Sequence, residues 1–193
     1  MCIIALGVSS CSQRENVIST SDNLPKSRSE GFVLDYPPVG AMSSHYIVIN
    51  AMEMAWSQMK NRVLSGNGRA ESGFYIRYLF EQNTFSTSLI TEGPVAPNCN
   101  VAANMILSIP MGDFHLASGF FHCHTSYEKC PPGRYRYTGP SDNDIISADS
   151  IKIPGILYDY VAPIIIAGHS TNDPYMVYPF GPDQRPDTTL TNF

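Results

Sequence analysis

The sequence predicts an α/β domain in which a mixed β-sheet is flanked by helices. Three observations favour it: a long segment with helical periodicity, several short strand-like runs, and a second helical segment with a polar start. In the first helical segment, residues 51–64, apolar side chains recur at steps of three and four, so one stripe faces a sheet. That stripe consists of Met52, Ala55, Trp56, Met59 and Val63. Asn50 is expected to cap this helix and Gly66 to end it.

The strand-like runs follow the first helix. They cover residues 73–80, 84–91 and 113–124. Ser141 or Asp142 then begins a second helix over residues 142–151. Residues 161–168 are predicted to be the most buried strand, with residues 175–180 as its partner across a turn. Helix, strands, helix and a closing hairpin together give a layered α/β sandwich.

The length of 193 residues suits one sizeable domain. This domain is expected over residues 31–182, between a polar leader at 1–30 and a loose tail at 183–193. Within the leader, Val-Ser-Ser-Cys11 resembles the lipobox of bacterial lipoproteins, which makes Cys11 a candidate lipid anchor. An extracytoplasmic, membrane-anchored bacterial protein is therefore expected. The alternative for residues 2–6 is a buried first strand.

The net charge argues against a nucleic-acid-binding protein, and the cysteine spacing argues against a cysteine-rich zinc site. The net charge of −5 argues against nucleic-acid binding, because phosphate contacts need clustered Lys and Arg, and the 12 present are scattered. Beyond the leader, Cys99, Cys123 and Cys130 form no Cys-x-x-Cys pair, which disfavours a cysteine-rich zinc site. Cys130 could pair with Cys99 or with Cys123 outside the cytoplasm, or all three could be small buried residues.

The strongest functional signal lies in residues 119–144. An apolar run delivers His122 and His124 at positions i and i+2, and alternation along a strand places both imidazoles on one face. Asp144 follows in the segment Ser141-Asp-Asn-Asp144. Two neutral imidazoles and a carboxylate are a typical ligand set for zinc. The sequence therefore predicts a zinc site on His122, His124 and Asp144.

The motif order resembles the JAB/MPN/JAMM metalloproteases, in which a glutamate precedes His-x-His and Ser-x-x-Asp. The resemblance covers roughly residues 45–182 and is closest to bacterial JAB-like domains of secreted and toxin-associated proteins. It implies a cytidine-deaminase-like α/β sandwich and a zinc-dependent amide or isopeptide hydrolase. It assigns Glu71 as general base and Ser141 as oxyanion donor, with a peptide or isopeptide as substrate.

The chain departs from that family in the loop between the two motifs. Residues 125–140 form a longer loop than the family has, and Thr125 stands where a proline is usual. The loop carries three tyrosines and two arginines, which predicts a lid or a specificity wall. An ordinary surface insertion is the alternative.

Other interpretations of these residues stay open. The domain could be a catalytically silent JAB-like binding protein or a structural surface lipoprotein. His122-x-His124-x-x-x-Glu128 also matches half of a cupin metal motif, although the second half is missing. A second Ser-x-x-Asp stands at Ser170 to Asp173. The glutamates that compete with Glu71 are Glu53, Glu81 and Glu92.

Overall fold

The computed structural model describes residues 32–190, which form three α-helices and ten β-strands. The polar leader at 1–30, its lipobox-like Cys11 and the last residues, 191–193, lie outside the described part of the chain. Within the described part, no helix is both long enough and apolar enough to cross a bilayer.

The main sheet is mixed and has six strands. Its order is β3-β2-β5-β7-β9, with β4 paired to the start of β2. The strands are β2 (Ser72–Leu79), β3 (Thr84–Thr87), β4 (Thr91–Glu92), β5 (Ala117–Cys123), β7 (Gly155–Tyr160) and β9 (Tyr175–Phe180). β5 and β7 run parallel, whereas the other neighbouring pairs are antiparallel. The predicted mixed sheet is thus confirmed.

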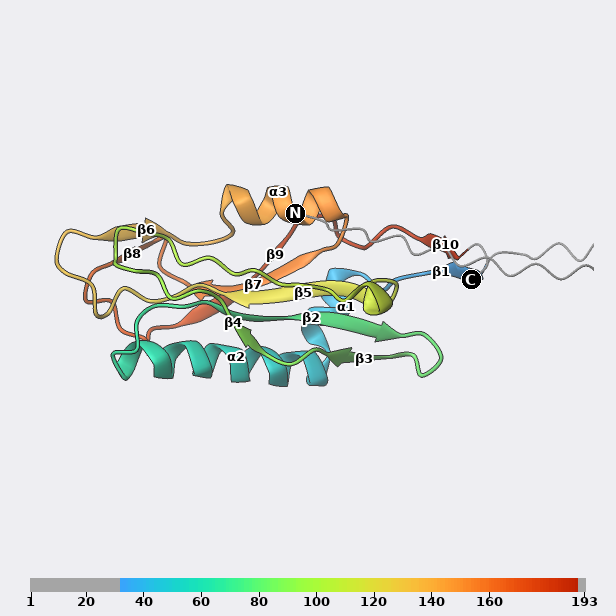
Figure 1. Ribbon diagram of the computed structural model, residues 1–193, viewed down its shortest axis with the longest axis horizontal. Helices are drawn as coiled ribbons and strands as arrows, with labels where there is room; N and C mark the ends of the chain where they lie inside the picture. The colour runs from blue at the N-terminus through green and yellow to red at the C-terminus, as the bar shows by residue number, and fades with distance from the viewer. Residues whose placement is uncertain (1–31, 191–193) are drawn as a thin grey trace, which may run out of the picture. The chain divides into compact units, whose positions relative to one another are not determined.

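Helices cover both faces of this sheet, as Figure 1 shows. α2 (Tyr46–Leu64) lies on one face, α3 (Asp142–Ile151) lies on the other, and α1 (Val39–Ser44) leads into α2. All five apolar residues of the predicted stripe are buried on α2. They pack in one core with residues of the sheet such as Phe74, Phe121 and Tyr158. The layered α/β arrangement is therefore as predicted.

The long helix begins earlier than expected. Its N-cap is His45, so Asn50 is an interior residue and not the cap. The run Tyr-Ile-Val-Ile at 46–49 contains β-branched residues, which disfavour helix in isolation. Val48, however, is fully buried in the core. Burial of Val48 in the core offsets the weak local propensity of this turn, so the helix begins before the apolar stripe that the periodicity shows.

The connection between the parallel strands places the candidate site. Parallel neighbours need a crossover, and α3 lies between β5 and β7 in the chain. The chain therefore leaves the carboxyl end of β5, crosses a loop and enters α3 at its amino end. The last residues of β5 and the first turn of α3 come to face each other, which brings the two halves of the motif together.

The prediction of the most buried strand at 161–168 is wrong. β7 (Gly155–Tyr160) occupies the interior of the sheet with all six residues buried, and it pairs with β9. Residues Ile164–Ile166 form β8, which pairs with β6 (Tyr135–Tyr137) in a separate two-stranded sheet. Two of the three isoleucines in β8 are exposed. Apolar character alone favoured the isoleucine run, because Asp159 interrupts the apolar pattern of the true central strand.

The end of the described chain contacts its first strand and the loop before β5. β10 (Thr188–Leu190) pairs antiparallel with β1 (Phe32–Leu34). Arg185 is buried and donates hydrogen bonds to the carbonyl oxygens of Phe114 and Ala117. Residues 183–190 therefore take part in the fold.

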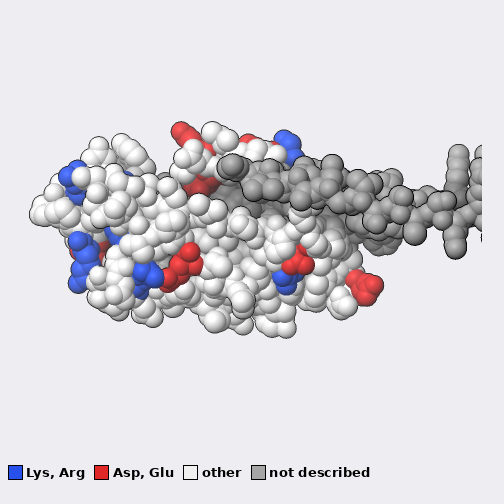
Figure 2. Space-filling view, in the orientation of Figure 1, with Lys and Arg blue, Asp and Glu red and all other residues white. Residues whose placement is uncertain are grey.

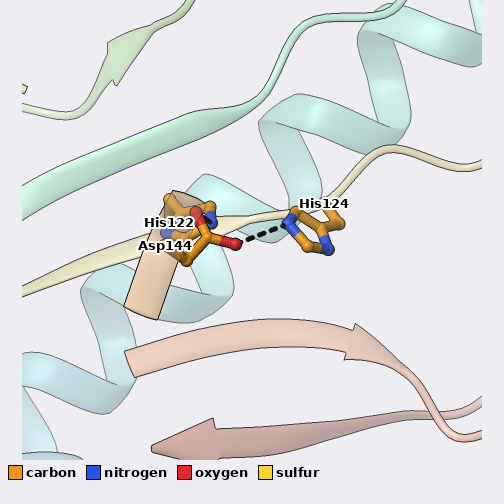
Figure 3. Close-up of side chains that lie close together, drawn as sticks. All are labelled: His122, His124 and Asp144. Carbon is orange, nitrogen blue, oxygen red and sulfur yellow. Dashed lines mark ion pairs between the residues drawn. The ribbon is translucent and has the colours of Figure 1, made fainter. Parts of the chain in front are cut away.

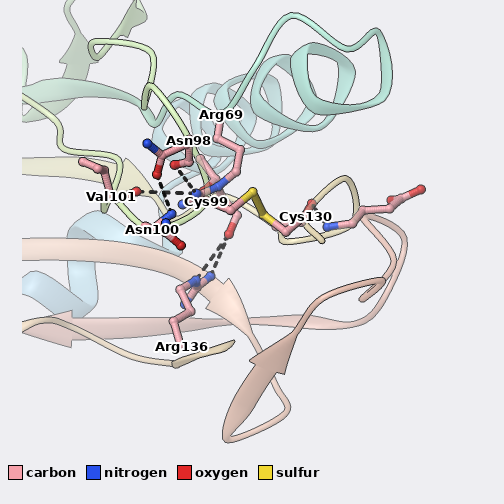
Figure 4. The surroundings of a disulfide bond; sticks show 10 residues. Arg69, Asn98, Cys99, Asn100, Val101, Cys130 and Arg136 are labelled. Atoms are coloured by element: carbon pink, nitrogen blue, oxygen red, sulfur yellow. Dashed lines mark hydrogen bonds between the residues drawn. A yellow bond between two sulfur atoms is a disulfide. The ribbon is translucent and has the colours of Figure 1, made fainter. Parts of the chain in front are cut away.

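One disulfide joins two loops at the carboxyl end of β5. It links Cys99 with Cys130 (Figure 4). Cys123 is a free thiol buried in the core. Of the pairings left open by the sequence, the structure thus selects Cys99 with Cys130. A structural disulfide indicates an oxidising, extracytoplasmic location.

Candidate metal centre

His122 and His124 come from the carboxyl end of β5. His122 lies inside the strand, between Gly73 of β2 and Leu157 of β7, and His124 follows directly after the strand. A Cβ atom on Gly73 would lie 2.4 Å from the carbonyl oxygen of Phe121, so only glycine lets β2 approach here. The backbone around His122 is therefore held closely on both sides.

Asp144 comes from the first turn of α3 and meets both imidazoles (Figure 3). Its Oδ1 lies 3.3 Å from Nε2 of His122, and its Oδ2 lies 3.5 Å from Nε2 of His124. One ligand atom from each of the three residues lies within 4.8 Å of the others. The residues predicted as metal ligands are thus brought together as one group that could hold a metal ion.

A buried nitrogen supports the fit of a cation to this group. Nε2 of His122 is buried and makes no hydrogen bond within residues 32–190. This nitrogen lies 3.3 Å from Oδ1 of Asp144, but the two atoms do not have the geometry of a hydrogen bond. A buried polar atom without a partner is costly, and a metal bound at Nε2 would satisfy it. The donor chemistry of two imidazoles and one carboxylate also suits zinc.

The Ser-x-x-Asp motif is a helix capping box. The hydroxyl of Ser141 accepts a hydrogen bond from the Asp144 N–H and donates one to Asp144 Oδ2, which also accepts from the Ser141 N–H. Ser141 is thus the N-cap, one of the two residues expected near the start of this helix. The same hydrogen bonds fix the Asp144 carboxylate toward the histidines.

Neighbouring groups favour the ionised form of Asp144. Burial acts to raise its pKa, but the imidazoles of His122 and His124 and the Ser141 hydroxyl outweigh burial. Together they hold the pKa of Asp144 well below its ordinary value. An ionised carboxylate is the form that binds a metal.

Asp159 is a residue in contact with a candidate ligand that the sequence analysis missed. It is fully buried in β7, and its Oδ2 lies 2.9 Å from Nδ1 of His124. Burial acts to raise its pKa, but His124 and Arg136 lower it to about 2. When one ring nitrogen of a histidine binds a metal, a carboxylate that accepts a hydrogen bond from the other ring nitrogen fixes the orientation of the ring. The available signal was an acidic residue inside an otherwise apolar strand.

Arg136 in turn holds the carboxylate of Asp159. From strand β6 its guanidinium forms two hydrogen bonds with the Asp159 carboxylate, at 2.7 and 2.6 Å. It also donates to the carbonyl oxygen of Thr125. The loop 125–140 therefore supports the candidate ligands through Arg136, which adds to its predicted role as a lid or wall.

Glu71 lies beside the three candidate ligands without joining them. It precedes β2, is buried, and places its Oε1 3.9 Å from Nε2 of His124. Burial raises the pKa of its carboxyl above the ordinary value. Glu71 thus stays a candidate for the predicted general base, because such a base must lie close to the reacting groups.

The competing residues lie elsewhere. Glu53 accepts hydrogen bonds from Tyr158 and Tyr175, and Glu92 pairs with Arg62. Asp173 of the second Ser-x-x-Asp contacts His169. Glu81 is exposed in the turn between β2 and β3. Of these four glutamates, Glu71 is the one that lies beside the candidate ligands.

The cupin interpretation also fails. Glu128 accepts a hydrogen bond from the Thr171 N–H and does not belong to the group of candidate ligands. The helices on both faces of the main sheet differ from a jelly roll of strands.

A cleft of about 520 Å³ opens beside these residues. Glu71, His124 and Asp144 line it, together with Arg69 and residues of the loops 102–105 and 136–141. The Cys99–Cys130 disulfide ties together the two loops that border this cleft. The cleft gives a ligand access to two of the candidate metal ligands, His124 and Asp144.

The comparisons with known proteins add no relative to this picture. No family model, curated protein or solved structure matches the chain. The mixed α/β fold and the group of two histidines and an aspartate therefore carry the functional argument.

Proposed function

We propose that this chain is a zinc-dependent hydrolase of amide or isopeptide bonds. The observation that carries the proposal is the grouping of His122, His124 and Asp144, with a buried nitrogen of His122 left unpaired within the described residues. Catalytic zinc sites use three protein ligands of this kind and leave the fourth position for water. The order of Glu71, His-x-His and Ser-x-x-Asp resembles the JAMM metalloproteases and supports the same function.

The chemistry follows from the placement of Glu71. A zinc ion on three such ligands would lower the pKa of a bound water to about 7. Glu71 would accept a proton from the attacking water while the water oxygen bonds to the carbonyl carbon. The C–N bond then breaks, and Glu71 returns the proton to the leaving nitrogen. One buried carboxyl thus serves both steps.

The amino end of α3 would stabilise the oxyanion formed in this reaction. Free N–H groups and the positive end of the helix dipole favour negative charge there. The role predicted for Ser141 as a donor to the oxyanion requires its hydroxyl to turn away from Asp144, to which it now donates.

That hydrogen bond also favours a second candidate function. A serine committed to the Asp144 carboxylate suits a domain that binds a metal and performs no hydrolysis. Such a silent domain would bind a partner or serve as a surface lipoprotein. The two functions share the metal and differ in turnover.

Metal analysis of the purified, oxidised full chain tests the metal site that both functions require. We expect about one zinc per chain, lost in the His122→Ala/His124→Ala variant because two of three ligands are removed. His115→Ala is the matched control, since this histidine lies outside the candidate metal ligands. Zinc retained in the double variant would disprove the assignment.

Turnover is tested on a mixed pool of peptides and lysine isopeptides, with product masses measured. Glu71→Gln should keep the zinc and lose the hydrolysis seen in the unmodified protein. Zinc uptake without any cleavage of the pool would favour the silent domain. Equal cleavage by Glu71→Gln would remove Glu71 from the mechanism.

A further inference from the structure

Arg69 is a buried cation on the wall of the cleft that holds Glu71 and Asp144. It is 7% exposed and precedes Glu71 by two residues in the chain. Its backbone pairs with Ala96 in an isolated β-bridge, which fixes this part of the chain beside the loop 93–110. The guanidinium is therefore held in place at the cleft.

The contacts of this guanidinium are with neutral groups. Its Nε donates to the Thr125 hydroxyl at 3.2 Å, and its Nη1 lies 3.3 Å and 3.5 Å from the carbonyl oxygens of Asn98 and Val101. It also lies over the ring of Tyr127, 4.3 Å from the ring centre. Figure 4 shows Arg69 reaching toward Asn98 and Val101 beside the disulfide.

No carboxylate of the described chain lies within 4.0 Å of the Arg69 guanidinium. Arg62, Arg77 and Arg136 each have such a carboxylate partner. Arg185 has none either, but it lies over the rings of Tyr36 and Phe114 and does not line this cleft. A buried charge is normally paired, so an unpaired one at the edge of a cleft points to an anion from outside.

The charges around the cleft support this reasoning. Glu71, Asp144 and Asp159 supply three carboxylates, and Arg69 and Arg136 supply two guanidinium groups. A divalent ion would change the small excess of negative charge into an excess of positive charge. Arg136 is already engaged by Asp159, so the remaining cation is Arg69.

We propose that Arg69 binds a carboxylate of the substrate, so that the chain acts on amides that carry a carboxylate close to the bond that is cleaved. The inference rests on the proposed hydrolase function and narrows its substrate class. Arg69 is then a specificity residue, since a planar guanidinium binds a carboxylate through two parallel hydrogen bonds.

The test measures binding rather than turnover. Two probes bind zinc through a hydroxamate group and carry a carboxylate on opposite sides of its C–N bond. In N-hydroxysuccinamate the carboxylate is on the carbonyl side, and in N-formyl-N-hydroxy-β-alanine it is on the nitrogen side. Each is compared with its neutral primary amide by calorimetry on the zinc-loaded full chain. We expect one carboxylate probe to bind about tenfold more tightly than its amide, the size of one charged hydrogen bond. The probe that shows this preference identifies the side of the scissile bond on which Arg69 binds the carboxylate.

Three variants assign the preference to a residue. Arg69→Gln should reduce the ratio to near one, and Arg69→Lys should retain part of it because the charge remains. Arg134→Gln is the control, since Arg134 is an exposed arginine of the loop 125–140 that does not line the cleft, and it should keep the full ratio.

The outcomes distinguish the two proposals. If zinc binds and both carboxylate probes bind no better than their amides in the unmodified protein, the role of Arg69 is overturned while the hydrolase proposal stands. A preference that survives in Arg69→Gln overturns it as well. A chain that takes up no zinc refutes both.

Discussion

Nδ1 of His124 lies 2.9 Å from a carboxylate oxygen of Asp159, while Nε2 of the same ring faces Asp144 and Glu71. The two nitrogens of His124 therefore have separate partners, one inside the sheet and one at the cleft. Arg136 donates hydrogen bonds to both oxygens of the same Asp159 carboxylate. The orientation of the candidate ligand His124 thus depends on a residue of β7 and on a residue of the loop after β5.

Replacing Asp159 with asparagine should weaken zinc binding about 10- to 100-fold, because the outer partner of a metal-binding histidine orients its ring and raises its basicity. Competition with a coloured chelator measures the affinity. Asp149→Asn is the control, because Asp149 is an exposed residue on α3. Equal affinities in the two variants would show that Asp159 has only a structural role.

The metal-free protein should lose stability as the pH rises through about 9. Burial lowers the pKa of His124, but hydrogen bonds with Asp144 and Asp159 outweigh burial and raise it to about 9. Because the folded chain binds this proton more tightly than the unfolded chain, the stabilisation is complete below 6.5, the ordinary pKa, and is lost toward about 9. Urea unfolding across this range, with excess chelator, measures the effect. His124→Gln should remove this part of the pH dependence, and an unchanged profile would contradict it.

Local patterns were enough to predict much of the fold and of the candidate site. The buried stripe of α2 follows from apolar spacing, and the start of α3 follows from the capping box at Ser141. His122, His124 and Asp144 were found because two short motifs determine how their side chains are presented. Each of these signals lies within a few residues of the chain.

What could not be predicted depends on contacts between distant residues. Asp159 acquires its role only when β7 lies beside β5 and Arg136 folds back from its loop. The choice of Cys99 as partner of Cys130 depends on how two loops meet. Likewise, the apolar run Ile164–Ile166 was predicted to be a central strand. Apolar character alone does not show which of two apolar runs lies in the main sheet.

Gly73→Ala should destabilise the fold by about 1 to 3 kcal/mol, the range for overpacking in a tight core. The added Cβ would lie 2.4 Å from the Phe121 carbonyl oxygen and 3.1 Å from the His122 Cβ, so β2 and β5 have to move apart. Chemical denaturation measures the change in the free energy of unfolding. Gly112→Ala is the control, because a Cβ there meets nothing within 4 Å. A neutral Gly73→Ala would mean that the strands separate without cost.

Replacing Cys99 and Cys130 with serine should lower the free energy of unfolding by about 3 to 4 kcal/mol, the entropy expected for the 31-residue separation of the pair. A reducing agent should lower the stability of the unmodified protein and leave the double variant unchanged.

Zinc binding should survive this change, because the candidate ligands come from the end of β5 and the first turn of α3, whereas the disulfide joins the loops that border the cleft. Binding of the carboxylate probes should weaken, since Arg69 donates to carbonyl oxygens of the loop that holds Cys99. Loss of zinc from the double variant would show that these loops hold the candidate ligands themselves, and not only the wall of the cleft.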